Sequence, residues 1–310
     1  MGFSGPLDWL RARRRRRALH ALRAEIEAFF AELRGTPVLF FANPGNAGDS
    51  LIAAATWQAF ARNGIAATQI GLEAEVEGQV VLLGGGGNFI PLYREIADAI
   101  ARFAGRARKI VILPHTIRGN EDVLARMDGR YTIFCRDERS LRQVRAARPD
   151  VDVRLAHDMA FHLDAMALLR DEALAARAEP RWRDALAQAG TDKAKLARPE
   201  GVDLRRIDVE STAETPRSDI DISEVFRFGT GADQAPVAAW CFLKSISMAR
   251  HVVTDRLHVA IGAALLGTPC RLHDNSYGKN AAVYRHSLAG RFPNVAFAPG
   301  PADEKEPPWR

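Results

Sequence analysis

Short apolar runs alternate with helical segments along the first half of the chain. The runs lie at Val38–Ala42, Val80–Leu83, Ile110–Leu113, Thr132–Cys135 and Val153–Ala156. Helical segments follow them and begin near Ser50, Pro91, Asn120 and Asp137. Continuous apolar strands that alternate with helices are typical of a parallel sheet covered on both faces. The pattern therefore predicts an α/β fold with a Rossmann-like domain over residues 37–165.

The same alternation returns after Pro236. Helices are expected near Val237–Ala249, Leu257–Leu266 and Asn280–Leu288, with strands at His251–Thr254 and Cys270–His273. They predict a second Rossmann-like domain over residues 236–310, with a frayed tail after Pro299. Residues 166–235 are rich in alanine and charged residues. We expect them to form the crossing between the halves and an elaborated surface region, with a strand near Val202–Val209. The two domains are expected to face a cleft.

Residues 1–36 are predicted to form a basic amphipathic helix. Its apolar residues recur at helical spacing, at Leu19, Leu22, Ile26, Phe29, Phe30 and Leu33. The six arginines of the segment Arg11–Arg17 contribute six positive charges, one more than the formal net charge of +5 of the whole chain. The rest of the chain is therefore close to neutral. This basic face is either solvated or attracted to anionic lipid. Nucleic acid is not expected as a partner, because no basic stripe interleaved with aromatic residues occurs elsewhere.

The chain of 310 residues carries no apolar run long enough to span a membrane. Its start lacks the apolar block of a secretory signal. The three cysteines, Cys135, Cys241 and Cys270, are widely spaced and offer neither a disulfide framework nor a zinc pattern. We therefore expect a cytoplasmic protein, with peripheral association at the inner face of the cytoplasmic membrane through Arg11–Arg17 as an open alternative.

Ligands in open parallel sheets bind beyond the carboxyl ends of the strands, so the loops after the strands matter most. After the first strand, Gly45, Asn46 and Gly48 permit close backbone approach, and the following helix start offers free N–H groups to an anion. The spacing is neither a Walker loop nor GxGxxG. Asp49 either caps this helix or faces the cleft as an acid, a base or a hydrogen-bond acceptor.

A second strand ends in four consecutive glycines followed by Asn88. Such a run costs conformational entropy and indicates close approach of a ligand or of facing backbone, which makes Gly85, Gly86 and Asn88 candidate cleft residues. Later strands are followed by His115, Arg136 and Asp158, which are candidates for the same rim. His115 is otherwise a satisfied structural histidine and Arg136 a surface ion pair; in the cleft, the fork of Arg136 suits a carboxylate or phosphate.

The densest segment begins with Asp255, Arg256 and His258 and continues as a uniformly small and apolar helix. Such a helix is buried, and a buried helix carries charged residues at its entrance only with partners. Cations at a helix N-terminus also oppose the helix dipole unless an anion binds there. The segment therefore predicts an anion site. Farther along, Asn275 and Lys279 either form only a loop and cap or add donors to the cleft.

In this order, seven segments make the chain resemble the polysaccharide pyruvyltransferase family over roughly residues 38–285: GNAGDSLI, LLGGGGNF, LPHT, FCRDERS, AHDMAF, TDRLHVAIGAALLGTP and DNSYGKN. The resemblance implies a glycosyltransferase-B-like pair of Rossmann domains. It also implies transfer of the pyruvyl group of phosphoenolpyruvate onto a sugar of an exopolysaccharide or cell-surface glycan, on a lipid-linked precursor, to form a ketal. The family's donor-binding positions correspond here to Arg136, Arg256, Leu257 and His258.

The residues suit this chemistry. Phosphoenolpyruvate carries a carboxylate and a phosphate, which Arg136 and Arg256 from opposite halves would clamp when the cleft closes. His258 is the expected proton donor or phosphate partner. His115 and Asp49 are expected to handle acceptor hydroxyl protons, with Asp158 behind them. Phosphoenolpyruvate is a co-substrate, and neither a cofactor nor a metal is expected.

Two other functions fit the same pattern. One is a nucleotide-sugar glycosyltransferase of the same architecture, which would need a ribose-binding residue and a larger aromatic-lined pocket. The other is a non-catalytic component of a polysaccharide assembly complex, docked at the membrane by the arginine-rich helix.

Overall fold

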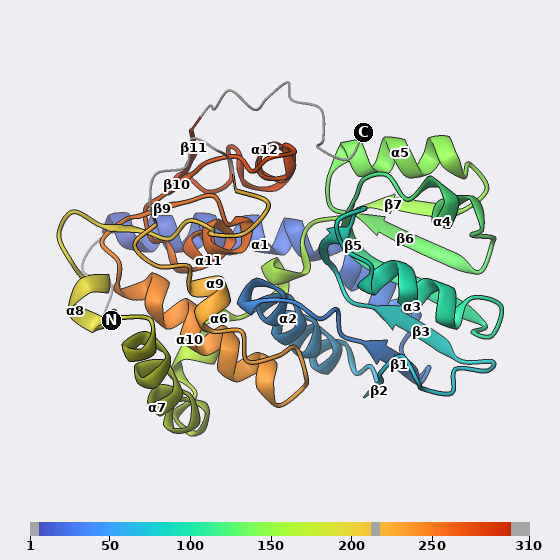
Figure 1. Cartoon of the computed structure of the whole chain (residues 1–310), viewed down its shortest axis with the longest axis horizontal. Helices are drawn as coiled ribbons and strands as arrows, with labels where there is room; N and C mark the ends of the chain where they lie inside the picture. The colour runs from blue at the N-terminus through green and yellow to red at the C-terminus, as the bar shows by residue number, and fades with distance from the viewer. Residues whose placement is uncertain (1–5, 212–217, 299–310) are drawn as a thin grey trace.

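The computed structural model describes residues 6–211 and 218–298 as a mixed α/β fold (Figure 1). The tail after Pro299, expected to be frayed, lies outside the described residues. Two parallel sheets are present in the described part of the chain, one with seven strands and one with four. The predicted α/β class is therefore confirmed, and the architecture is consistent with the expected Rossmann-like and glycosyltransferase-B-like folds. The domain boundaries remain a prediction.

The seven-stranded sheet has the order β2-β1-β3-β5-β6-β7, and β4 pairs with β5 beside this path. Its strands are β1 (Val38–Phe41), β2 (Ala67–Gln69), β3 (Val80–Leu83), β4 (Gly86–Phe89), β5 (Lys109–Ile117), β6 (Tyr131–Cys135) and β7 (Asp152–Leu155). All their pairings are parallel. Every residue of β3 and β6 is buried, as continuous apolar runs require when helices cover both faces of a sheet.

Adjacent residues of the central strands point to opposite faces and enter two separate cores. Phe40 belongs to a core that includes α1 (Pro6–Glu32) and α2 (Ala47–Asn63). Phe41 belongs to another core, which the sheet shares with α3 (Glu95–Phe103), α4 (Glu121–Ala125) and α5 (Glu138–Ala147). This alternation follows from the two-residue period of a strand.

The four-stranded sheet has the order β11-β10-β9-β8. Its strands are β8 (Val202–Asp203), β9 (Val252–Thr254), β10 (Cys270–Leu272) and β11 (Val295–Phe297). The helices of this half are α9 (Ile222–Val225), α10 (Gln234–Met248), α11 (Leu257–Leu266), α12 (Lys279–Val283) and the π-helix η2 (Tyr284–Leu288). In α11, eight of the ten residues are buried, as its uniformly apolar sequence predicts.

The segment between the two sheets is largely helical. It contains the 3-10 helix η1 (Met159–His162), α6 (Ala165–Arg170), α7 (Glu172–Gln188) and α8 (Lys193–Leu196). In α7, Leu174, Trp182 and Leu186 are buried in the main core, and the indole N–H of Trp182 donates to Oγ of Ser245 in α10 at 2.8 Å. Part of the expected surface region therefore belongs to the core.

Three local expectations are corrected by the structure. The strand expected at Ile110–Leu113 continues to Ile117, so His115 lies inside β5 and not in a loop. The last two glycines of the glycine run form β4 with Asn88 and Phe89. The strand expected near Val202–Val209 ends at Asp203, and the rest of that range is a loop.

Helix α1 runs behind both sheets (Figure 1). Its residues Leu22, Ile26, Phe29 and Phe30 are buried in the main core, as their spacing predicts. Among the described residues, none of the helices is both long enough and apolar enough to cross a bilayer.

We predict that Trp182→Ala lowers the free energy of unfolding by about 3–5 kcal/mol, because it empties a large buried site and leaves Ser245 without its indole partner. Urea unfolding measures this difference. Arg181→Ala, at an exposed position of the same helix, serves as the control and should change stability by less than about 0.5 kcal/mol. Equal effects of the two substitutions would show that α7 does not contribute to the core.

Candidate active site

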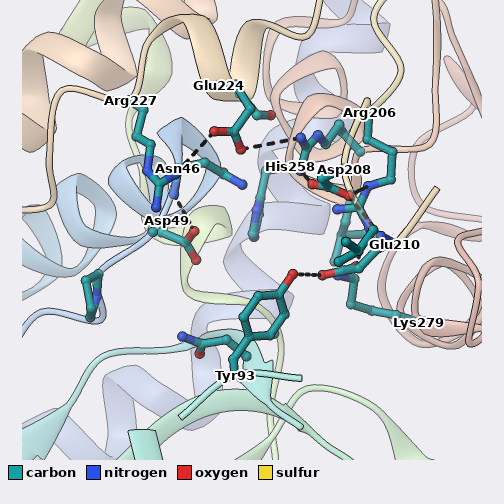
Figure 2. A pocket seen from close by; sticks show the side chains of 18 of the residues that line it. Asn46, Asp49, Tyr93, Arg206, Asp208, Glu210, Glu224, Arg227, His258 and Lys279 are labelled. Atoms are coloured by element: carbon teal, nitrogen blue, oxygen red, sulfur yellow. Dashed lines mark hydrogen bonds and ion pairs between the residues drawn. The ribbon is translucent and has the colours of Figure 1, made fainter. Parts of the chain in front are cut away.

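A cavity of about 460 Å³ is lined by loops that follow strands of both sheets (Figure 2). From the first sheet come the loop before α2, the glycine run and the end of β6; from the second come the loops after β8, β9 and β10. Nine of the predicted residues line it: Gly45, Asn46, Asp49, Asn88, Arg136, Arg256, Leu257, His258 and Lys279.

The N-terminus of α2 forms one wall. Asn46 caps the helix: its side chain accepts from the N–H of Gly48 at 2.8 Å, while the carboxylate of Asp49 accepts from the N–H of Asn46 at 2.9 Å. Asp49 therefore completes the capping box and also lines the cavity, and its role there as an acid or a base stays a prediction. A Cβ on Gly48 would collide with Nδ1 of His258, so this glycine allows α2 and α11 to approach each other.

The glycine run is needed for close approach. A Cβ on Gly85 would lie 2.8 Å from the carbonyl oxygen of Pro114, so facing backbone excludes a side chain there. A Cβ on Gly87 would lie 2.6 Å from Nη2 of Arg136 and 3.5 Å from Nζ of Lys279. Gly87 thus leaves room for two cations that flank it from different halves of the chain.

Arg136 and His258 are linked by one buried carboxylate. Nη1 of Arg136 donates to Oδ2 of Asp158 at 2.6 Å, and Nε2 of His258 lies 3.5 Å from the same oxygen. Nε of Arg136 also donates to the hydroxyl of Thr116 at 2.8 Å. Arg136 and Asp158 are 1% and 0% exposed, so the buried ion pair holds the guanidinium in one orientation at the cavity wall.

Burial and charge set the protonation states of the two carboxylates. Burial acts to raise the pKa of Asp158, but the charge of Arg136 and the interaction with His258 outweigh it and lower this pKa well below its usual range. For Asp49 burial prevails over the charge of His258 and raises the pKa. The pKa values of the two carboxyl groups therefore shift in opposite directions. Asp158 stays ionised, and Asp49 holds a proton more readily.

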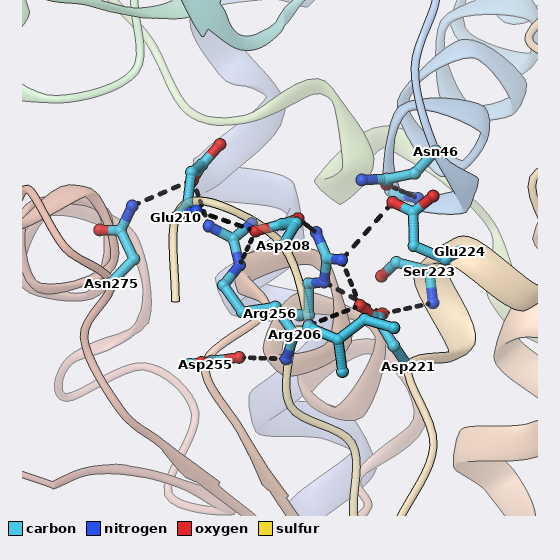
Figure 3. A network of polar contacts seen from close by, with 12 residues as sticks. Asn46, Arg206, Asp208, Glu210, Asp221, Ser223, Glu224, Asp255, Arg256 and Asn275 are labelled. Atoms are coloured by element: carbon cyan, nitrogen blue, oxygen red, sulfur yellow. Dashed lines mark hydrogen bonds and ion pairs between the residues drawn. The ribbon is translucent and has the colours of Figure 1, made fainter. Parts of the chain in front are cut away.

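Arg256, at the start of α11, is enclosed by carboxylates (Figure 3). Its Nη1 lies 2.8 Å from Oδ2 of Asp208, Nε donates to Oδ1 of Asp221 at 3.1 Å, and Nη2 pairs with Asp221 and lies 3.5 Å from Glu224. The structure brings Arg136 and Arg256 to one cavity, each already paired with carboxylates of the chain. The expected partners of the buried Arg256 are thus present.

A second cationic cluster surrounds Glu210. Its carboxylate accepts from Nζ of Lys279 at 2.8 Å and from the hydroxyl of Tyr93 at 2.9 Å, and it also pairs with Arg206. Burial lowers the pKa of Lys279 to about 8 despite the opposing charge of Glu210. Asn275 donates to the same carboxylate at 3.1 Å but does not line the cavity.

Several predicted residues lie behind the cavity and not on its surface: Gly48, Gly85, Gly86, His115, Asp158 and Asn275. His115 is fully buried, and its Nε2 lies 3.0 Å from Oδ1 of Asn88. Burial and the charge of Arg136 lower the pKa of His115 to about 3, so its ring is neutral. It can position Asn88, but it does not reach the cavity to exchange protons with an acceptor.

Sequence reasoning missed the residues that follow β8. Arg206, Asp208, Glu210, Glu224 and Arg227 all line the cavity. The rule that pointed to the other loops also applies to Arg206 and Asp208, but residues 204–209 were expected to continue the strand. Glu210, Glu224 and Arg227 follow in a segment that was expected to be a surface region. The correct end of β8 would have revealed the loop.

The described residues contain no group of three or more His, Cys, Asp or Glu side chains placed to hold a metal ion.

The fold and the composite cavity define an α/β protein whose candidate site is built from the loops of two parallel sheets. The family model described as polysaccharide pyruvyl transferase matches residues 46–277, so the chain belongs to this family, as the ordered motifs predicted. Among solved structures, the chain is similar to a functionally uncharacterised protein of Klebsiella pneumoniae, with a TM-score of 0.72 and 28% identity, covering 90% of this chain and 99% of that one. No curated protein matches the chain.

We predict that Asp158→Asn lowers the free energy of unfolding at neutral pH by about 3 kcal/mol, because it leaves the buried charge of Arg136 without a counterion. The pKa of Asp158 is depressed in the folded state, so its contribution is present above the ordinary carboxyl pKa and is lost as the pH falls. The difference between wild type and variant should therefore shrink below about pH 4.

Urea unfolding across this pH range measures the effect. Asp152→Asn is the control, because Asp152 forms an ion pair with Arg154 at 3.0 Å on the surface and should cost at most about 1 kcal/mol. A difference for Asp158→Asn that does not change with pH would contradict the ionised state assigned to this carboxylate.

Proposed function

We propose that the protein transfers the pyruvyl group of phosphoenolpyruvate onto a saccharide and forms a pyruvate ketal. The observation that carries this proposal is that Arg136 and Arg256, from different halves of the chain, line one cavity beside the N-terminus of α11. Phosphoenolpyruvate presents two anionic groups on a small frame, which two guanidinium forks can hold at once. Family membership supports pyruvyl transfer to a polysaccharide.

In the proposed reaction, a sugar hydroxyl adds to C2 of phosphoenolpyruvate. The methylene carbon gains a proton, and the hydroxyl loses its proton to a base. The C2–O bond to phosphate then breaks, and a second hydroxyl of the sugar bonds to C2 and releases its proton, which leaves a ketal and inorganic phosphate. The arginines stabilise the negative charge that gathers on the departing phosphate.

His258 is the proposed proton donor. Its Nε2 lies 3.5 Å from Oδ2 of the ionised Asp158, which orients the ring, and an imidazole can act as a general acid. Asp49 is the proposed group for the hydroxyl proton, because it lines the same cavity and burial raises its pKa. Asp158 acts as a positioning residue through Arg136 and His258. The structure offers His115 no direct part in these transfers.

The cavity favours this donor over a nucleotide sugar. The cavity has a volume of about 460 Å³. Among the described residues that line it, Tyr93 and His258 are those with an aromatic ring. A nucleotide-sugar site is expected to be larger and lined by several aromatic rings. Comparison of thermal shifts with phosphoenolpyruvate and with a UDP-sugar separates these functions, and a shift with neither ligand would favour a non-catalytic role.

We predict that Arg256→Lys lowers kcat/KM for pyruvyl transfer by about a hundredfold or more, because lysine keeps the charge but lacks the fork. Mass analysis of a saccharide acceptor for the added pyruvate measures the product, and thermal unfolding verifies the fold of the variant. Arg94→Gln is the control, because Arg94 is exposed and pairs with Asp98 outside the cavity. Unchanged turnover with Arg256→Lys would overturn the proposed donor site.

The proposed acceptor is a lipid-linked precursor of an exopolysaccharide or cell-surface glycan, met at the inner face of the cytoplasmic membrane. Helix α1 supports this location, because Trp9 and Leu10 are 51% and 52% exposed and lie among the exposed Arg13, Arg16 and Arg17. A helix that presents aromatic and basic side chains together suits the interface of an anionic bilayer.

We predict that replacing Arg13, Arg16 and Arg17 with glutamine weakens binding to phosphatidylglycerol vesicles at low salt by about a hundredfold, at roughly 1 kcal/mol per arginine. Vesicle co-sedimentation measures the partition, and phosphatidylcholine vesicles report binding without surface charge.

The matched control replaces three exposed arginines on other helices and loops, Arg102, Arg130 and Arg142. The control has the same net charge as the α1 variant. Equal loss of binding by both triple variants would show that total charge, and not α1, attracts the protein to the membrane.

A further inference from the structure

The carboxylate of Glu210 is surrounded by hydrogen-bond donors that together form a cage for an anion. Four donors from three parts of the chain converge on it: Tyr93, Arg206, Asn275 and Lys279 (Figures 2 and 3). Asn275 is fully buried, and Arg206, Glu210 and Lys279 are at most 7% exposed. Two cations buried this deeply, Arg206 and Lys279, need an anion between them.

The residue that supplies this anion belongs to an exposed loop. Ile207 and Val209 are 74% and 78% exposed, although both flank residues of the cage. Glu210 therefore reaches inward from a segment that buries little apolar surface. Few apolar contacts oppose the movement of such a segment.

The cage adjoins the proposed donor site. Gly87 separates Lys279 from Arg136, because a Cβ at this position would contact the charged ends of both. Arg206 shares Asp208 with Arg256: Nε of Arg206 lies 3.4 Å from one oxygen of Asp208, and Nη1 of Arg256 lies 2.8 Å from the other. The cage is thus contiguous with both arginines of the donor site.

We infer that Arg206, Lys279 and Asn275 form a phosphate-binding subsite, and that Glu210 is an internal competitor which a ligand's phosphoryl group displaces. A phosphoryl group has more acceptor oxygens than a carboxylate and a larger charge, so it can engage these donors and Arg136 together. The subsite deepens the proposed function and rests on it for one point, that the incoming group is the phosphate of phosphoenolpyruvate. Return of Glu210 would then favour release of the phosphate product.

Glu210→Gln tests the competition directly. The variant keeps the side chain's size but removes its charge, so it should bind inorganic phosphate about tenfold more tightly than wild type, as measured by calorimetric titration. Glu95→Gln removes a carboxylate from the exposed rim of the same cavity and should change phosphate affinity by less than about twofold. Equal or weaker binding by Glu210→Gln would overturn the inference.

Hydrogen exchange of the wild-type protein tests displacement without any substitution. With saturating phosphate, amides of residues 207–211 should exchange faster as Glu210 leaves, while the N-terminus of α11 becomes protected. Protection of 207–211 would instead show that Glu210 stays in the cage, and the inference would fail.

Separate arms with phosphoenolpyruvate and with pyruvate distinguish this inference from the proposed function. Pyruvate lacks the phosphoryl group and should not gain affinity in Glu210→Gln. Phosphate competition without any pyruvyl transfer would refute the proposed reaction and leave the subsite intact. Pyruvyl transfer by the wild-type protein, without a gain in phosphate affinity in Glu210→Gln, would refute the subsite and leave the proposed reaction intact.

Discussion

The site depends on the buried carboxylate of Asp158. It follows β7, and its Oδ1 accepts from the N–H of Ala160 at 2.8 Å, which fixes its orientation by the backbone. Its other oxygen faces Arg136 from the first sheet and His258 from the helix after β9. In a region of low dielectric such a paired charge fixes its partners firmly. The guanidinium of Arg136 and the imidazole of His258 are therefore positioned by the same atom.

The fold could largely be predicted because the apolar pattern determines it. The continuous runs at β1, β3 and β6 can be buried only between two helical layers, and the predicted bounds of α11 coincide with those observed. The short edge strands β2 and β11 were missed. Each has only three residues, and five of these six residues are at least partly exposed, so neither alternation nor continuous hydrophobicity marks either strand.

The candidate site was predicted less completely, for two physical reasons. Residues at strand ends, such as Arg136 and Arg256, are located by the rule for parallel sheets, whereas the true end of a strand depends on pairing that one sequence does not reveal. This uncertainty misplaced His115, which lies inside β5, and concealed Arg206 and Asp208, which lie in the loop after β8. Asp158 was found, but its shared contact with two partners is visible only in three dimensions.

One core joins the elements on which the two halves of the site stand. Leu22 and Phe30 of α1, Leu51 of α2, Trp240 of α10 and Ile261 of α11 belong to it together. A hinge that rotated one sheet away from the other would have to split this apolar cluster and expose it to water, at a cost that grows with its area. Substrate entry through rearrangement of the short polar segments at the rim avoids that cost. Rates of turnover should accordingly reflect local loop kinetics more than rigid-body swinging of large parts.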